Sequence, residues 1–405
     1  MALTSALMRL LLITNLYPPQ ELGGYGRCMA DFCWALKQRG HELQVLCNDA
    51  FYLGISSDTG PSGEPVAREL LLKGDFCDGV HLMQGALQQN AVDTHNQTVI
   101  KHWLENKSWD AILLGNLDLL GVGLLHWLLS QQLKVLHHIG FVHSPYAIEQ
   151  QPNVKNYKLL AASNTVKTRL IAEGIRASDA AIVYPGARTE LFGPNAIDRE
   201  LPEAPCRMTG KPLHICFAGL LMESKAPHTL LEAIAILYQE GYPIRASLAG
   251  GPFQKSYVNA MRSFCVDKNI IQFITFYKQL TREQLARFFR LHHAAVFPST
   301  HPEAFGIVGV EAMASGLALL SSGIGGASEV FEIDKSGLKF EAGDSKSLAM
   351  QIKRLFNEPG LLKALQENGI ERARSQFDVQ NSAQQIETLL TRDQQTFDSS
   401  AIKQF

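Results

Sequence analysis

The chain has 405 residues, of which 46% are hydrophobic and 19% are charged, with a formal net charge of −2 at pH 7. This composition excludes a disordered chain, and the charge gives no reason to expect a nucleic-acid partner or strong electrostatic attraction to a membrane. The length exceeds what one ordinary hydrophobic core accommodates, so we expect two or three domains.

The seven cysteines are scattered and include no Cys-x-x-Cys pair, which gives no indication of a zinc ribbon or a disulfide framework. A reducing, cytoplasmic location is expected. The N-terminal apolar run lacks a basic leader and a small-residue cleavage site, so we interpret it as a buried strand. No window approaches the ~20 apolar residues of a membrane-spanning helix. Peripheral contact with the inner face of a membrane and the oligomeric state stay open.

The first half of the chain alternates short apolar runs with helical stretches. A strand at 10–14 leads through a glycine-rich loop into a helix that stops at Gly40, and a strand follows at 43–47. This beginning is typical of a doubly wound parallel sheet. Residues 50–65 are interpreted as a long surface loop. Further strands are expected at 80–83, 111–114, 134–139, 158–162 and 181–184, which predicts a Rossmann-like domain over residues 1–191.

The first glycine-rich loop is not a dinucleotide fingerprint, because Met29 stands where the third glycine of that motif belongs. The sequence therefore lacks the main feature that would indicate a dehydrogenase. Gly23 and Gly24 let the backbone approach a ligand closely, or they simply make a turn.

Residues 192–212 are rich in proline and are predicted to be a linker. A second alternating series over 213–377 contains expected strands at 214–218, 245–249, 271–276, 294–297 and 317–320. Pro227 suits the first turn of a helix, and a terminal helix over about 378–405 is expected to cross back to the first domain. The predicted fold is thus α/β, with two Rossmann-like doubly wound domains facing across a cleft.

The segment Val296–Glu329 contains a strand, a polar loop and a helix that opens near Gly306. The amides of residues 305–308 would be donors at a helix N-terminus, which favours an anion such as phosphate. Glu303, before the helix, can accept hydrogen bonds from ligand hydroxyls, and Glu311 reaches another part of the same ligand. Two carboxylates beside an anion site fit a nucleotide sugar, which carries diols on either side of its phosphates. The alternative is a solvated loop glutamate and a helix glutamate near a dipole.

Lys225 ends a run that begins at Gly219, directly after a strand and before a helix. A lysine at the carboxyl end of a parallel sheet points into the crevice where such folds bind ligands, where it can neutralise a diphosphate. It can equally be a solvent-facing lysine. Gly250 and Gly251, after the next strand, form another turn that permits close approach.

Together these motifs resemble the GT-B retaining glycosyltransferases of family four, the glycosyl transferases group 1. The resemblance is carried by E-A-F-G-I-V-G-V-E from Glu303 to Glu311, by Gly219 to Lys225, by Leu248 to Pro252 and by the N-terminal Y-P-P…G-G loop. It covers almost the whole chain. It implies an enzyme that transfers a sugar from a nucleotide-diphosphate sugar to a hydroxyl acceptor, which is a saccharide, a lipid or a small metabolite. Polysaccharide biosynthesis is the expected setting.

The resemblance also implies roles for individual residues. Those expected to be catalytic are Glu303, Lys225 and His138. Those expected to bind the donor, mainly in the second domain, are Gly219, Lys225, Gly250, Gly251, Glu303, Ala304, Phe305, Gly306, Ile307, Val308 and Glu311. Those expected on the phosphate-loop and acceptor side are Gly23, Gly24, His137, His143 and Arg188. Glu303 would contact the donor sugar, Glu311 the ribose and Lys225 the diphosphate. The expected donor is a UDP- or GDP-sugar, with no further cofactor. No metal is expected, since the lysine and helix amides would replace it.

Two departures from the family pattern concern charged groups. Leu220 stands where the family usually has an arginine, so a cation for the diphosphate would come from elsewhere, with Arg188 and Arg27 as candidates. The family also commonly has a cleft histidine directly after the strand that corresponds to 134–139. Here that position falls on Gly140.

His137, His138 and His143 are the candidates for this histidine, and strand alternation places the first two on opposite faces. We favour His138, while a structural role stays open for each of the three.

Two other functions fit the same fold. One is a nucleotide-sugar epimerase or a sugar phosphorylase, and the epimerase would need no acceptor. The other is a catalytically impaired homologue that binds nucleotide sugars without turnover, which Leu220 and the ambiguous histidine would explain.

Overall fold

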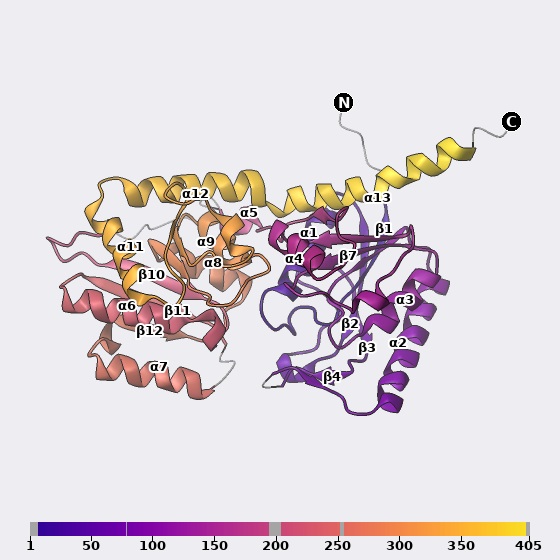
Figure 1. The fold of residues 1–405 in the computed structure, drawn as a ribbon, viewed down its shortest axis with the longest axis horizontal. Helices are drawn as coiled ribbons and strands as arrows, with labels where there is room; N and C mark the ends of the chain where they lie inside the picture. Colours follow the sequence, from indigo (N-terminus) through magenta and orange to yellow (C-terminus); the bar gives the residue numbers. More distant parts are fainter. Residues whose placement is uncertain (1–6, 78, 194–203, 252–254, 402–405) are drawn as a thin grey trace. The chain divides into compact units, whose positions relative to one another are not determined.

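The computed structural model describes residues 7–77, 79–193, 204–251 and 255–401, with side chains described as far as residue 391. The chain divides into two units. The first comprises Met1–Gly186 together with Val379–Phe405, and the second comprises Ala187–Asp378. Each unit is built on a parallel sheet with covering helices (Figure 1), which confirms the predicted α/β class. The central part of the predicted linker, residues 194–203, lies outside the described residues.

The sheet of the first unit has the strand order β3-β2-β1-β6-β7-β8-β9, and its neighbours pair in parallel. Its strands are β1 (Arg9–Ile13), β2 (Glu42–Asn48), β3 (Val66–Leu70), β6 (Ala111–Leu114), β7 (Lys134–Ile139), β8 (Tyr157–Ala161) and β9 (Ala181–Ile182). The chain builds outward from β1 to β3 and then restarts on the other side of β1 with β6. The strands β1 and β6 therefore flank the topological switch point of this sheet.

Helices cover both faces of this sheet, which explains why β1 and β6 are continuous apolar runs instead of alternating ones. Helix α1 packs against α13, and α2 packs against α3 (Figure 1). The helices of the unit are α1 (Tyr25–Gln38), α2 (Ala86–Asn106), α3 (Val122–Ser130), α4 (Asn164–Ala172) and α13 (Val379–Ala401).

Two details of the first unit differ from the sequence prediction. The edge strand β3 was not expected, because two charged residues interrupt the apolar residues of its sequence V-A-R-E-L. The predicted strand at 80–83 does not join the parallel sheet. Its central residues form β5 (His81–Leu82), which pairs in antiparallel fashion with β4 (Gly74–Asp75). Both residues of β5 are exposed, so no burial draws them into the sheet.

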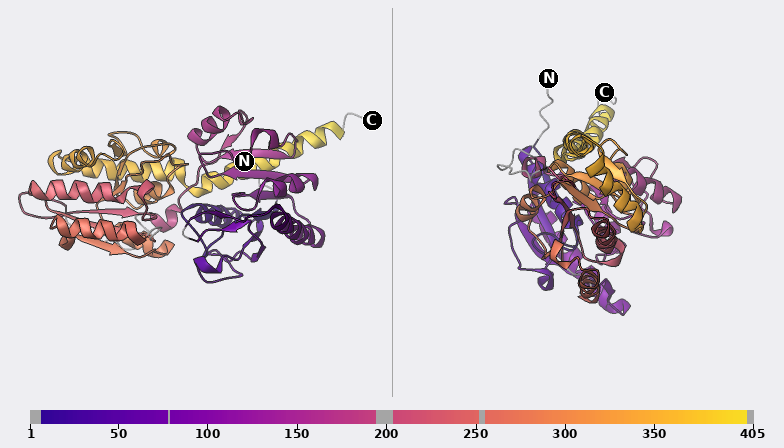
Figure 2. Two further views of the ribbon diagram at one scale, coloured as in Figure 1. Left: turned by 60° about the horizontal axis from the view of Figure 1, so that its bottom comes forward. Right: turned by 90° about the vertical axis from the view of Figure 1, so that its left-hand side faces the viewer.

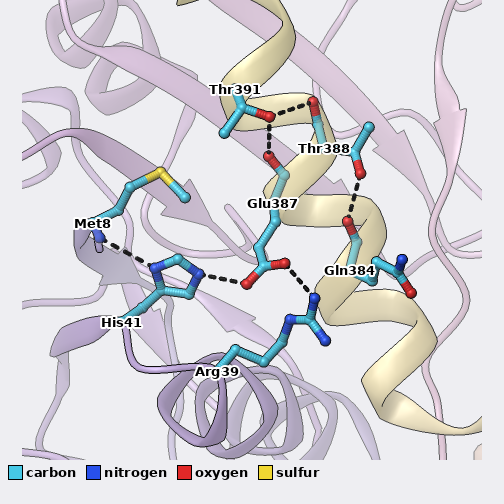
Figure 3. Close-up of polar contacts among 7 residues, drawn as sticks. All are labelled: Met8, Arg39, His41, Gln384, Glu387, Thr388 and Thr391. Atoms are coloured by element: carbon cyan, nitrogen blue, oxygen red, sulfur yellow. Dashed lines mark hydrogen bonds and ion pairs between the residues drawn. The ribbon is translucent and has the colours of Figure 1, made fainter. Parts of the chain in front are cut away.

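Helix α13 is held on the first unit by a buried carboxylate. Glu387 accepts a hydrogen bond from Arg39 Nη2 at 2.5 Å and contacts His41 Nε2 at 2.7 Å (Figure 3). The Nδ1 of His41 accepts from the Met8 amide, which assigns the proton of a neutral ring to Nε2. Lys134 adds a hydrogen bond to the Leu389 carbonyl. The last helix thus belongs to the unit that the chain left almost 200 residues earlier.

The sheet of the second unit has the order β12-β11-β10-β13-β14-β15, again with parallel neighbours. Its strands are β10 (Leu213–Ala218), β11 (Ile244–Ala249), β12 (Ile274–Tyr277), β13 (Ala294–Phe297), β14 (Ala318–Ser321) and β15 (Gly337–Lys339). The strand predicted at 271–276 begins with a 3-10 turn at Ile271–Phe273, and β15 was not expected. The switch point lies between β10 and β13.

The second unit also has helices on both faces of its sheet (Figure 2). Helix α6 packs against α7 and α11, and α9 packs against α12. Its helices are α5 (Thr189–Phe192), α6 (Pro227–Gln239), α7 (Lys255–Asp267), α8 (Arg282–Arg290), α9 (Ile307–Ala314), α10 (Ala327–Val330), α11 (Ser345–Asn357) and α12 (Leu361–Phe377). Pro227 opens α6 as predicted, since a first-turn residue needs no amide donor.

Among the described residues, no helix combines the length and apolar character needed to cross a bilayer.

Replacing Glu387 with Gln should destabilise the first unit. Burial alone would raise the pKa of Glu387, but hydrogen bonds from Arg39 and His41 outweigh it and hold the pKa below its usual value of 4.5. A charged hydrogen-bonding group of this kind stabilises by about 2 to 3 kcal/mol. All four tryptophans lie in the first unit, so urea unfolding followed by tryptophan fluorescence measures the loss.

The stabilisation by Glu387 should depend on pH in a defined direction. Because its pKa is lowered on folding, the contribution is present above the unfolded value of 4.5 and is lost as the pH falls through the folded value. The difference between wild type and Glu387→Gln should therefore be largest at neutral pH. Gln384→Ala, an exposed change on the same helix, is the control. A difference that grows on acidification would contradict this account.

Candidate functional site

Three loops of the second unit meet at its switch point. They follow β10, β13 and β14, which are neighbours in the sheet. The Thr300 amide donates to the Ser224 carbonyl at 2.9 Å, which joins the first loop to the second. The Gly326 amide donates to the Glu303 carbonyl at 2.7 Å, which joins the second loop to the third. Backbone hydrogen bonds therefore fix the segment that carries Glu303.

Lys225 and Glu303 form the polar centre of these loops. The Nζ of Lys225 lies 2.6 Å from Oε1 and 2.8 Å from Oε2 of Glu303. The Ser299 hydroxyl donates to Oε1 of the same carboxylate at 2.5 Å. The two side chains retain 29% and 15% of their exposure, respectively. The structure thus brings together the lysine and the glutamate that the sequence singled out from motifs 78 residues apart.

Helix α9 begins directly after Gly306, whose φ is +111°. A Cβ at this position would lie 3.0 Å from the Phe297 ring, so glycine is favoured by both conformation and packing. The preceding Phe305 is buried and stacks edge-on against Phe377. Ile307 and Val308 form the first turn of α9, where helix geometry leaves amides without carbonyl partners inside the helix. The predicted amide-rich opening therefore starts within a few residues of Glu303.

The glycines that follow β10 and β11 pack backbone against backbone. A Cβ on Gly250 would lie 1.8 Å from the Gly219 carbonyl oxygen. The Leu221 amide donates to the Gly251 carbonyl at 3.0 Å. These predicted donor-site glycines are therefore adjacent, and Gly250 has a steric reason to lack a side chain.

Glu311 lies on α9 but is almost fully enclosed, with 1% of its side chain exposed. Its Oε1 lies 3.1 Å from Nη1 of Arg282, the first residue of α8. The sequence analysis did not identify Arg282. A signal was available, because Thr281 is a typical N-cap residue, and in the structure its hydroxyl accepts a hydrogen bond from the Gln284 amide. This cap marks Arg282 as the first residue of α8.

In the first unit, the predicted loop lies at the carboxyl end of β1. Gly23 has a φ of +72°, and Gly24 immediately precedes α1. Asn15 and Asp118, which the sequence analysis missed, follow β1 and β6 at the switch point. Asn15 Nδ2 donates to Asp118 Oδ2 at 3.3 Å. Burial raises the pKa of Asp118 to about 6.

The two strand histidines are both buried. Burial lowers the pKa of His137 to about 3 and that of His138 to about 4, so both rings are neutral at physiological pH. His138 Nε2 lies 2.9 Å from the Val183 carbonyl oxygen, and Nδ1 lies 3.1 Å from the Tyr25 hydroxyl. Since both nitrogens have partners and the ring has no exposed surface, this geometry favours the structural role that the sequence left open.

Gly140 follows the strand that carries these histidines. A Cβ there would lie 1.9 Å from the Tyr25 ring, which stacks on His138. Tyr25 therefore fills the space that a side chain at position 140 would need. His143 is exposed, with Nδ1 3.4 Å from Glu173.

The two arginines proposed to compensate for Leu220 have acidic neighbours. Arg188, predicted on the acceptor side, lies in the second unit and donates to Glu190 at 2.8 Å. Arg27 donates to Glu21 at 2.6 Å. Among the described residues, no group of three or more His, Cys, Asp and Glu side chains is arranged to hold a metal ion.

The chain has the GT-B fold of its structural neighbours, with two Rossmann-like units, and its second unit carries a lysine–glutamate pair before a helix N-terminus. Residues 204–372 match the family model described as "Glycosyl transferases group 1". This match lies within the second unit and spans less than half of the chain, and the relatives that follow are sugar-transferring enzymes as well.

Relatives align with most of the chain. The chain is 28% identical over 297 residues to a D-inositol 3-phosphate glycosyltransferase of Corynebacterium urealyticum, an alignment that covers 64% of this chain and 68% of that protein. The chain is 25% identical over 402 residues to a glycogen synthase of Mycobacterium tuberculosis, an alignment that covers 93% of this chain and 92% of that protein. The Anabaena protein HepE, solved with UDP and glucose, superposes with a TM-score of 0.71 at 19% identity, covering 95% and 99%.

Replacing Gly326 with Ala should disrupt the three-loop arrangement. Its φ of −60° suits alanine, but a Cβ would lie 2.1 Å from the Ala304 carbonyl oxygen. Overpacking of this kind costs about 1 to 3 kcal/mol, and the displaced Glu303 loop should lower sugar transfer. Melting temperature and activity measure the two effects.

Gly309→Ala on α9 is the matched control. Its Cβ would meet only ordinary contacts of 3.5 Å or more, and alanine favours a helix interior by up to about 1 kcal/mol over glycine. If the two variants melted alike and kept equal activity, the described packing of the loops would be wrong.

Proposed function

We propose that this glycosyltransferase moves a sugar from a nucleotide-diphosphate sugar to a hydroxyl acceptor, with retention of anomeric configuration and without a metal. The observation that carries the proposal is the contact between Lys225 and Glu303 beside the start of α9. It couples a cation suited to a diphosphate with a carboxylate suited to sugar hydroxyls. The complex of HepE with UDP and glucose supports a nucleotide-sugar donor.

The difficult step is departure of the charged diphosphate from the sugar. Lys225 and the first amides of α9 would stabilise the negative charge that develops on the leaving oxygen. Both are attached to backbone that hydrogen bonds between loops hold in place, so little reorganisation is needed as the charge develops. These groups would do the work that a divalent cation does in other transferases.

Glu303 would accept hydrogen bonds from the hydroxyls of the donor sugar. Ser299 and Lys225 both donate to its carboxylate, which fixes its orientation. The bond from the anomeric carbon to the phosphate oxygen breaks, and a bond to the acceptor oxygen forms on the same face. The proton of the acceptor hydroxyl passes to the departing phosphate oxygen, so no protein nucleophile is required. Positioning both partners supplies much of the rate.

The second unit would bind the donor and the first unit the acceptor. Gly23, Gly24 and the polar pair Asn15–Asp118 lie at the switch point of the first unit, where doubly wound sheets bind ligands. His138 would support Tyr25 there. The donor is expected to carry UDP or GDP. The setting is expected to be polysaccharide biosynthesis in the cytoplasm, with peripheral membrane contact.

Lys225→Met and Glu303→Gln should each lower transfer by a hundredfold or more while preserving the fold, as removal of a transition-state contact typically does. A thermal-shift screen of UDP-, GDP- and ADP-sugars first identifies the donor, because a bound ligand raises the melting temperature. Calorimetry then separates the roles. Lys225→Met should weaken binding of the nucleoside diphosphate, whereas Glu303→Gln should lose mainly the added affinity of the sugar.

Lys335→Met is the control for lysine removal, since Lys335 is exposed and pairs only locally with Glu332. It should transfer sugar like wild type. If Lys225→Met and Glu303→Gln both transferred sugar at the wild-type rate, the proposed function would be wrong. Sugar-nucleotide conversion in the absence of an acceptor would instead identify an epimerase.

The product should carry the anomeric configuration of the donor, and a chelator should leave the rate unchanged. Proton NMR of the product reads the configuration, because the new glycosidic bond does not interconvert between anomers. An inverted product would overturn the same-face mechanism. A rate abolished by EDTA and restored by a divalent ion would overturn the assignment of charge stabilisation to Lys225 and α9.

A further inference from the structure

Four aromatic rings of the first unit form a stack that runs from its core to its surface. Phe32 and His138 are fully buried, and their rings meet edge to face at a centroid distance of 5.1 Å. The ring of Tyr25 lies near-parallel to that of His138, at 5.8 Å and 25°. The ring of Phe141 lies near-parallel to that of Tyr25, at 6.3 Å and 19°. Since Phe141 is 47% exposed, the stack ends in a large apolar ring that the unit leaves half uncovered.

The outer rings of this stack are held in place by the backbone. The Tyr25 hydroxyl donates to the His138 carbonyl at 2.6 Å. A Cβ at Gly140 would lie 1.9 Å from the Tyr25 ring, so a larger residue at this position would displace the ring. Phe141 directly follows Gly140 in the chain. A ring with a fixed support has little freedom left to lose when a ligand covers it, so the exposed end of the stack is preorganised for a ligand.

The exposed end of the stack lies at the same edge of the sheet as the polar switch-point residues. Tyr25 opens α1 after the loop that follows β1, whereas Asp118 follows β6 and Phe141 follows β7. These three strands are consecutive neighbours in the sheet. Burial raises the pKa of the Tyr25 hydroxyl, and negative charge at Cys28 and at Asp118 raises it further, as expected for a carboxylate near the ring. An aromatic face and a carboxylate are therefore found together at this edge.

This combination matches one class of acceptor. A pyranose ring carries hydroxyls around its edge and axial C–H groups on its faces. The C–H groups are attracted to the negative face of an aromatic ring, and the hydroxyls donate to a carboxylate such as Asp118. A phosphorylated metabolite matches less well, because a carboxylate repels phosphate. An acyclic polyol has no rigid apolar face, and a hydrocarbon chain would not use the carboxylate.

We propose that Phe141, supported by Tyr25, stacks against the apolar face of an uncharged pyranose in the acceptor, while Asp118 accepts hydrogen bonds from its hydroxyls. The acceptor is accordingly a saccharide. The inference rests on the proposed function, because it names the acceptor class of that reaction. It gives a binding role to Phe141, which the sequence analysis did not select. It also gives a reason for Gly140, since the Tyr25 ring that supports Phe141 occupies the space of a side chain there.

A set of acceptors tests the substrate class. With the donor that the thermal-shift screen identifies, wild type is offered methyl glucoside, maltose, cellobiose, sorbitol and a glucose phosphate, and mass spectrometry measures the products. Transfer to at least one uncharged pyranoside should exceed transfer to sorbitol and to the glucose phosphate by roughly tenfold or more. A preference for sorbitol or for the glucose phosphate would overturn the inference.

Variants of Phe141 test the stacking contact itself. Phe141→Ala should raise the KM of the pyranoside acceptor by about tenfold. It should leave kcat and the donor affinity within about twofold of wild type, since the contact is the same before and during the reaction. Phe141→Tyr should keep the wild-type KM, and Phe141→Leu, apolar but without a ring, should give an intermediate value. Initial rates give kcat and KM, calorimetry gives the donor affinity, and thermal melting checks the fold of each variant.

Phe51→Ala is the matched control. Phe51 also lies in the first unit and is 77% exposed. It follows β2, which lies on the other side of β1 from β6 and β7, so its removal should leave the acceptor KM unchanged. If both variants raised KM equally, loss of any exposed apolar ring would account for the effect, and the stacking role would be overturned.

The remaining outcomes separate this inference from the proposed function. If wild type neither binds a nucleotide sugar nor transfers a sugar, the proposed function fails. If wild type transfers sugar and Phe141→Ala keeps its acceptor KM, the stacking role is overturned while the function stands. The inference also fails if wild type binds a nucleotide sugar but uses none of the pyranosides. Two further results would reassign the ring and overturn the inference: a loss of donor affinity in Phe141→Ala, or a loss of its binding to phosphatidylcholine vesicles at unchanged acceptor KM.

Discussion

The contact between Lys225 and Glu303 is the interaction on which the candidate site depends, and the sheet order makes it possible. These residues follow β10 and β13, strands that are far apart in sequence but adjacent in the sheet. The intervening β11 and β12 extend the sheet on the far side of β10. A doubly wound sheet thus places the loops that follow the carboxyl ends of these two strands side by side at its switch point. Their opposite charges nearly cancel, so the loops carry a polar pair without a large unbalanced charge.

The first unit repeats this construction with a different polarity. Its switch point, between β1 and β6, carries Asn15 and Asp118 instead of a lysine–glutamate pair. Burial raises the pKa of Asp118 to about 6, so this carboxyl group is still mostly ionised at neutral pH. The first switch point therefore carries a carboxylate without a cation in that pair, whereas the second pairs a lysine with a glutamate. A carboxylate repels phosphate and accepts hydrogen bonds from hydroxyls, so the first switch point would suit a hydroxyl compound better than a phosphate.

Sequence alone was sufficient where a local signal fixed the structure. The strand–loop–helix unit around Glu303 was predictable because Gly306 and the apolar runs mark its boundaries. The strands β3 and β15 were missed, because neighbouring strands and not their own sequences define them. Alternation placed His137 and His138 on opposite faces, but it could not show that both faces are covered. Arg282 was missed because its partner Glu311 lies on another helix.

The departure at Leu220 bears on how much charge the site supplies. Both arginines considered as substitutes have an acidic neighbour, Glu21 for Arg27 and Glu190 for Arg188, which offsets the charge that either could offer. In the proposed mechanism, Lys225 and the α9 amides would then stabilise most of the negative charge of the leaving diphosphate. Lys225 contacts both carboxylate oxygens of Glu303, and the Ser299 hydroxyl also donates to Oε1. These contacts hold the ammonium group at one place, so a phosphate that entered the site would meet a lysine whose position is already fixed.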